Sequence, residues 1–156
     1  MKSVIRYLVV CVLFTSLAHG QASQMTDERR KALLDYQLTL TRANQLIAAM
    51  GEMTQYVVSL PDYGERVRKS MQMTPAEQMA QMEKDPKAAD ILKRNQLTAK
   101  DYIIGVPALR MALLVAAGTP AGPNIIASPA NVAFAKANLS VLKPKMDATD
   151  GLGARR

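Results

Sequence analysis

Residues 98–118, TAKDYIIGVPALRMALLVAAG, decide the fold that we predict for this chain. Between Tyr102 and Ala117 the one charged residue is Arg110. A helix that is apolar almost all round has to be covered on every side by other elements. We therefore predict that this stretch forms a buried helix at the centre of the domain. A membrane span is disfavoured, because the run is shorter than about 20 residues and is interrupted by an arginine and a proline.

The ends of this central helix carry clear local signals. Thr98 followed by Asp101 is typical of a capped helix start, and Gly118 is typical of a helix end. Pro107 lies inside the stretch and has no backbone N–H. We expect it to kink the helix near residues 103–104.

A second long helix is predicted upstream. Apolar side chains recur at three- and four-residue spacing from Leu33 to Leu60, which is typical of an amphipathic helix. We expect it to start from an N-cap at Thr26 and to end before Pro61. Gly51 is the candidate point for a bend or break in it.

The rest of the chain reads as shorter helices and connections. Residues 61–73 are polar and basic and predict a connection. Three pairs of a capping side chain and a proline predict helix starts: Thr74-Pro75, Asp85-Pro86 and Ser128-Pro129. Residues 119–127 predict a loop that either covers the core or lines a pocket, and Pro144 is predicted to end the last helix.

Together these signals predict an all-α protein. We expect a single helical-bundle-like domain of four to six helices over residues 21–144, with a kinked apolar central helix. A flexible C-terminal tail is predicted over residues 145–156.

Residues 1–20 have the pattern of a signal peptide. Lys2 and Arg6 precede an apolar run of eleven residues, and Ala18 and Gly20 are the small residues before a cleavage point after Gly20. An uncleaved anchor is disfavoured, because eleven residues at about 1.5 Å each fall short of the ~30 Å hydrocarbon core. We predict an exported, periplasmic or secreted protein without stable membrane insertion.

Cleavage would remove the only cysteine, Cys11, and the only histidine, His19. The remaining chain has no thiol, no imidazole and no tryptophan, so it lacks the commonest general base and the commonest transition-metal ligands. The acidic residues show no reason to pair, and Ser140 with Lys143 matches S-x-x-K without companion motifs. We therefore predict a protein that is not an enzyme and has no cofactor.

The charge of the chain is modestly basic. Loss of Lys2 and Arg6 with the signal lowers the formal net charge from +7 to +5. Most basic residues are scattered, and aromatic residues make up only 4% of the chain. Export, scattered charge and few aromatic side chains together argue against nucleic-acid binding.

Methionine is the outlier of the composition, with ten in the chain. Four of them crowd together: Met71, Met73, Met79 and Met82. Thioethers are soft ligands that select Cu(I), so these four are a candidate Cu(I) or Ag(I) site. The alternative is that they pack in the core or contact a partner, because methionine adapts to irregular surfaces.

Arg110 is the candidate polar site of the central helix. An unpaired buried charge is costly, so the arginine needs a partner. One interpretation is a salt bridge to Asp90, to Asp101 or to a helix C-terminus. The other is that Arg110 holds an anionic ligand or a partner carboxylate, with Tyr102 and Asn131 beside it.

Residues 74–142 resemble a group of uncharacterised, exported, all-helical bacterial proteins. The resemblance rests on Asp85-Pro86, on Leu97–Tyr102 (LTAKDY) and on Pro129–Phe134 (PANVAF). Similar chains often carry glycine just before the Leu-Thr pair, where this chain has Gln96. The resemblance implies an exported helical protein and implies no activity.

Met73–Gln78 (MTPAEQ) also resembles the LTxxQ signature of periplasmic helical stress chaperones, with Gln78 one position later. We predict a non-catalytic binding module, whose partner is another extracytoplasmic protein or an unfolded client. The predicted contact segment is residues 66–82, with the basic side chains of Arg66, Arg68 and Lys69 and the methionines already named. Binding of a soft metal ion by those methionines is the alternative.

Overall fold

The protein is all-α, as predicted. The structure, a computed structural model, describes residues 27–122 and 124–152, which form helices and no strands or sheet. The predicted signal peptide and the cap at Thr26 lie outside the described residues. Eight helices are found in the described part of the chain, more than the four to six expected: α1 (Asp27–Asp35), α2 (Leu40–Ser59), α3 (Tyr63–Gln72), α4 (Pro75–Lys84), α5 (Pro86–Arg94), α6 (Ala99–Ala116), α7 (Pro129–Ala137) and α8 (Leu139–Leu152). Within these ranges, no helix has the length and apolar character that crossing a bilayer requires.

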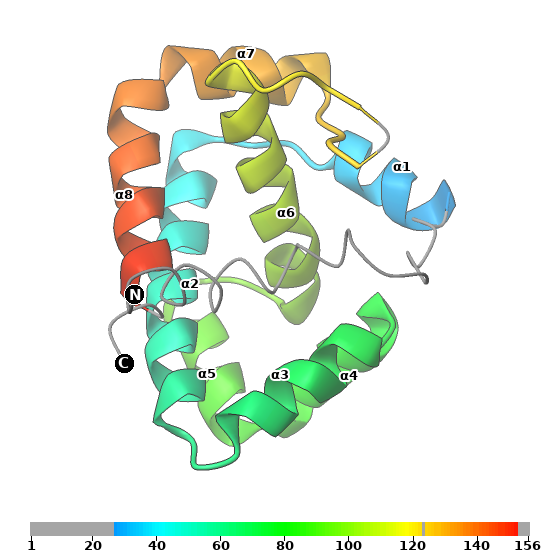
Figure 1. The fold of residues 1–156 in the computed structure, drawn as a ribbon, viewed down its shortest axis with the longest axis vertical. Coiled ribbons are helices and arrows are strands. Elements are labelled where there is room, and N and C mark those ends of the chain that lie inside the picture. The colour runs from blue at the N-terminus through cyan, green and yellow to red at the C-terminus, as the bar shows by residue number, and fades with distance from the viewer. Residues whose placement is uncertain (1–26, 123, 153–156) are drawn as a thin grey trace, which may run out of the picture.

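Helix α6 is the centre of the fold (Figure 1). It packs against α1, α2, α4, α5, α7 and α8, and both hydrophobic clusters of the core include its residues. The predicted capping box is present, because Thr98 Oγ1 accepts from the Asp101 N–H at 3.0 Å and an Asp101 carboxylate oxygen accepts from the Thr98 N–H. Pro107 lies inside α6 without ending it. The kink that we expect there stays a prediction.

The other predicted helix starts are also found. Thr74 forms a second capping box with Glu77, and the side chains of Asp85 and Ser128 cap α5 and α7. The loop before α7 lies against the core, where Ile126 is buried and its N–H lies 3.3 Å from the sulfur of Met111. The loop therefore covers the core at Ile126.

The predicted long helix is broken at residues 36–39, and not at Gly51, which lies within α2. Thr39 starts α2 by accepting a hydrogen bond from the Arg42 N–H. Asn131 of α7 holds the linker in place. Its Oδ1 accepts from the Leu38 N–H at 3.0 Å and its Nδ2 donates to the Tyr36 carbonyl at 2.7 Å. These bonds satisfy two backbone groups that a continuous helix would otherwise have paired.

Two stretches are helical against expectation. Residues 63–72 form α3, in which an ion pair between Asp62 and Arg66 spans one turn at the start. Helix α8 continues through Pro144 to Leu152, so residues 145–152 are not a tail. Leu142, Met146 and Thr149 are buried on one face of α8, and this packing offsets the backbone hydrogen bond lost at the proline.

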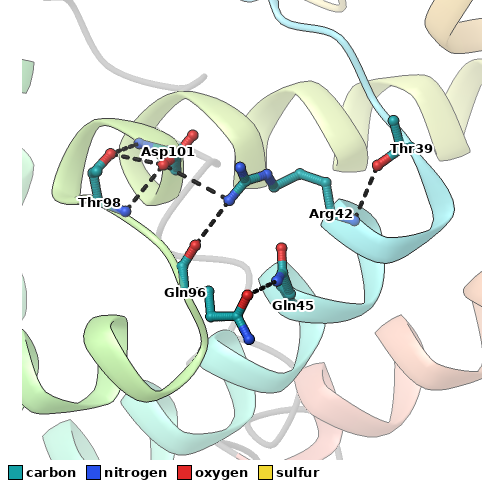
Figure 2. A network of polar contacts seen from close by, with 6 residues as sticks. All are labelled: Thr39, Arg42, Gln45, Gln96, Thr98 and Asp101. Carbon is teal, nitrogen blue, oxygen red and sulfur yellow. Dashed lines mark hydrogen bonds and ion pairs between the residues drawn. The ribbon is translucent and has the colours of Figure 1, made fainter.

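Figure 2 shows the polar network that joins the start of α2 to the start of α6. Arg42 donates to the carbonyl of Gln96 at 3.1 Å and pairs with Asp101 at 3.8 Å. Gln45 contributes a longer bond of 3.5 Å to the side chain of Gln96. Gln96 itself has φ 55°, the left-handed region that favours glycine.

Replacing Asn131 by alanine is expected to lower the free energy of unfolding by about 1–3 kcal/mol, because a backbone N–H and a carbonyl would stay buried and unpaired. Chemical denaturation followed by circular dichroism measures the change. Asn124→Ala, at an exposed turn position, is the matched control and should change little. Equal effects of the two substitutions would contradict the role given to Asn131.

Gly105→Ala is expected to destabilise the protein by about 1–3 kcal/mol through overpacking. A Cβ at this position would lie 2.6 Å from the hydroxyl oxygen of Tyr36 and 3.0 Å from a methyl of Leu46. Gly64→Ala on α3 is the control, since nothing lies within 4 Å of its Cβ and alanine favours helix. Thermal unfolding should show a lower Tm for the first variant and an unchanged or higher Tm for the second.

Candidate functional site

A cavity of about 300 Å³ lies between α2, α3, α4, α5 and α6. Its wall is mainly apolar, and α2, α4 and α6 supply most of that surface: Met50, Met53, Val57, Met82, Val106 and Pro107. The volume is at the lower end of the ~300–1,000 Å³ typical of small-molecule sites. The cavity is therefore the candidate functional site.

Helices α3 and α4 form the outer wall of this cavity. Neither helix has a fully buried residue, although Val67 of α3 and Met82 of α4 face the cavity. They are tied to each other by a hydrogen bond of 2.9 Å from the Gln78 side chain to the carbonyl of Ser70. Figure 1 shows them together at the end of the molecule away from α7. Their apolar side chains are thus only half covered in this structure.

Arg110 brings a charge into the cavity wall. Its guanidinium forms an ion pair with Asp150 in the last turn of α8, through both terminal nitrogens. The partners named from sequence are engaged elsewhere, since Asp90 pairs with Arg94 and Asp101 caps α6. The Arg110 Nε is buried and has no hydrogen-bond partner among the described residues.

Tyr102 lies two turns before Arg110 on the same helix and also lines the cavity. Burial raises the pKa of its hydroxyl to about 12, against the opposing effect of the Arg110 charge. The hydroxyl therefore stays protonated at neutral pH and remains a donor. No acceptor for it is found in the described ranges.

A second polar group of the wall consists of Tyr56 and Asp85. The Tyr56 hydroxyl donates to a carboxylate oxygen of Asp85 at 2.8 Å, and the Lys87 and Ala88 N–H groups donate to the other oxygen. Burial works to raise the pKa of Asp85, but these hydrogen bonds outweigh it and hold the pKa below the ordinary 3.8. The Asp85 carboxylate is therefore already satisfied within the protein.

The other residues singled out from sequence do not gather at one point. Asn131 holds the α1–α2 linker and does not line the cavity beside Arg110. Arg66 lines the cavity and pairs with Asp62, while Arg68 and Lys69 are exposed on α3. Sequence reasoning missed Asp150, because it lies 40 residues from Arg110 in a segment expected to be a tail.

The four clustered methionines lie along α3 and α4. Met71 is exposed, Met73 is half-buried at the α3–α4 junction, and Met79 and Met82 pack against the core. Their binding of a soft metal ion stays a prediction. Within the ranges described, no group of three or more His, Cys, Asp or Glu side chains is placed to hold a metal ion.

This arrangement offers an apolar space with donors in its wall. Such a site can enclose an apolar molecule and give its polar end a hydrogen-bond partner. The two carboxylates of the wall, Asp85 and Asp150, are held by internal partners.

Tyr56→Phe is expected to lower the free energy of unfolding by about 0.5–1.5 kcal/mol at neutral pH. The difference from wild type should shrink on acidification. A carboxyl group with a depressed pKa stabilises the fold above its ordinary pKa, and this stability is lost as the pH falls through the folded-state pKa. Denaturant titrations from neutral pH to below the pKa of Asp85 measure it.

Tyr63→Phe is the control for this change, because Tyr63 lines the same cavity from α3. It should have a small effect that does not vary with pH. A difference between Tyr56→Phe and wild type that stays constant down to low pH would contradict the assigned role of the Tyr56–Asp85 bond.

The comparisons with known proteins find no relative of this chain. No protein-family model matches the chain, and searches of curated proteins and of solved structures find no match either. The resemblance to exported helical bacterial proteins therefore stays a prediction.

Proposed function

We propose that the protein is an exported, non-catalytic binding module that encloses a small, largely apolar ligand in the cavity between α2 and α6. The observation that carries this proposal is the cavity itself, about 300 Å³ in volume and walled mainly by apolar side chains. Filling it would remove apolar surface from water at about 25 cal/mol per Å². A ligand would thereby complete a core that α3 and α4 cover only in part.

The structure favours a small ligand over a protein partner that binds across a broad surface. Only four large apolar side chains are exposed in the described part of the chain, one on each of α2, α3, α6 and α8. The cavity wall gathers more apolar side chains than that in one place. Within residues 66–82, the part that we propose contacts the ligand is therefore the side that lines the cavity, where Val67 and Met82 lie.

The proposal is tested by filling the cavity. Val57→Phe adds volume at a half-buried position of the wall, and Val141→Phe makes the same change at an exposed position of α8. The probe is the neutral fluorophore N-phenyl-1-naphthylamine, titrated into each folded protein. We expect saturable binding to wild type and to Val141→Phe, and a Kd about tenfold higher for Val57→Phe, or about 1.4 kcal/mol.

Equal affinity of the two variants would place the probe outside the cavity and contradict the proposal. Circular dichroism and Tm establish that both variants fold. Val67→Phe, in the part of the wall that α3 supplies, gives a second test if Val57→Phe does not fold.

A further inference from the structure

We infer that helix α3 is the lid of the cavity: it opens to admit the ligand, and a bound ligand holds it closed. This inference rests on the proposed function, since it describes how the same cavity is entered and closed. Three features of α3 carry it: what the helix packs against, how it is joined to its neighbours and what holds it in place.

Helix α3 packs on the cavity instead of on the core. Among the eight described helices, it is the one with no residue in either hydrophobic cluster and none packed against one. Its half-buried residues fall at three- and four-residue spacing on one face, and all of them line the cavity: Tyr63, Arg66, Val67 and Ser70. The other residues of α3 are exposed. A ligand in the cavity would therefore supply the packing that the inner face of α3 lacks.

Helix α4, the other outer helix, is anchored more firmly. It packs against α5 and α6, and its Met79 and Met82 pack against the larger hydrophobic cluster. Helix α3 has its most extensive packing against α2, which precedes it in the chain, and this packing is sparser than that of α4. An element with few buried apolar contacts opens at a lower free energy than the core does. We therefore expect α3 to open while α4 stays in place.

Two short joints separate α3 from the helices beside it. Leu60 ends α2 and Met73 ends α3, both with extended backbone. A proline follows each joint, Pro61 directly after Leu60 and Pro75 two residues after Met73. Proline disfavours helical backbone in the residue before it, so α3 does not merge with α2 or with α4 into one longer helix. Helix α3 can therefore open while its two neighbours keep their structure.

Among the described residues, a single side-chain hydrogen bond joins α3 to another helix. The Gln78 side chain of α4 donates to the carbonyl of Ser70 at 2.9 Å. The ion pair between Arg66 and Asp62 lies at the start of α3 itself and ties it to no other helix. Loss of the bond from Gln78 should therefore raise the open fraction of α3 about twofold to tenfold, the range for one hydrogen bond.

The test is hydrogen–deuterium exchange of the protein with and without N-phenyl-1-naphthylamine. Without the probe, we expect the backbone amides of α3 to exchange faster than those of α4 and α6. At a probe concentration about ten times its Kd, exchange in α3 should slow about tenfold, because α3 opens only in molecules that are free of the probe. The variant Val57→Phe, with its weaker binding, should show only about twofold slowing at the same concentration.

Exchange in α3 that is as slow as in α6 would overturn the lid, and so would exchange in α3 that the bound probe leaves unchanged. Either result would leave the cavity as the binding site, provided that Val57→Phe still weakens binding of the probe. Absence of saturable binding would overturn the proposed function as well.

Stopped-flow fluorescence with two variants of α4 tests the contact that closes the lid. Gln78→Ala removes the bond to the Ser70 carbonyl and should raise both the association and the dissociation rate constant of the probe about twofold to tenfold. Its Kd should stay nearly unchanged, because the bond holds α3 closed with and without the probe. Gln81→Ala is the matched control, since Gln81 also lines the cavity from α4 and its side chain makes no hydrogen bond to α3.

A rise in the dissociation rate constant alone would indicate that Gln78 contacts the probe, and it would overturn the role of Gln78 in closing α3. Equal effects of the two substitutions would overturn that role too. Circular dichroism establishes that both variants fold. If Gln78→Ala does not fold, the exchange experiment on the unmodified protein decides.

Discussion

The need to cover α6 on every side is the constraint on which the rest of the structure depends. Between residues 102 and 117 this helix has one charged side chain and no polar face to turn toward water. Helices α1, α2, α4, α5, α7 and α8 all pack against it. At Gly105 the absence of a side chain lets Tyr36 approach the helix backbone, which brings the linker between α1 and α2 against α6. Much of the arrangement of the other helices follows from this burial.

The cavity arises where that cover is incomplete. Helix α4 packs against α6 but has no fully buried residue. Helix α3 has no fully buried residue either. Arg110 enters the wall of the resulting space and needs a counter-charge, which Asp150 supplies from the last turn of α8. Helix α8 therefore has to continue past Pro144 to bring Asp150 to Arg110. The ion pair between Arg110 and Asp150 thus links the burial of α6, the length of α8 and the polarity of the cavity.

Features that depend on neighbouring residues were predictable from the sequence. The caps at Thr74, Asp85, Thr98 and Ser128 each involve a side chain and the backbone within three residues of it. Features that depend on distant residues were not. The break between α1 and α2 relies on Asn131, 93 residues from Leu38, and the burial of Met146 on α8 carries the helix past a proline that locally favours an end.

The candidate site was also predictable only in part. Arg110 and Tyr102 stand out because polar groups on an apolar helix require partners, and the same reasoning selected Asn131. In the structure, Asn131 and Arg110 differ in how far their polar atoms find hydrogen-bond partners. Both polar ends of Asn131 are matched by the backbone of the linker, so its burial is explained by the fold alone. The Nε of Arg110 is buried without such a match in the described part of the chain, and Arg110 is one of the residues that line the cavity. Its terminal nitrogens pair with Asp150, so the fold accounts for the charge of Arg110 but leaves one of its donors without a partner in that part of the chain.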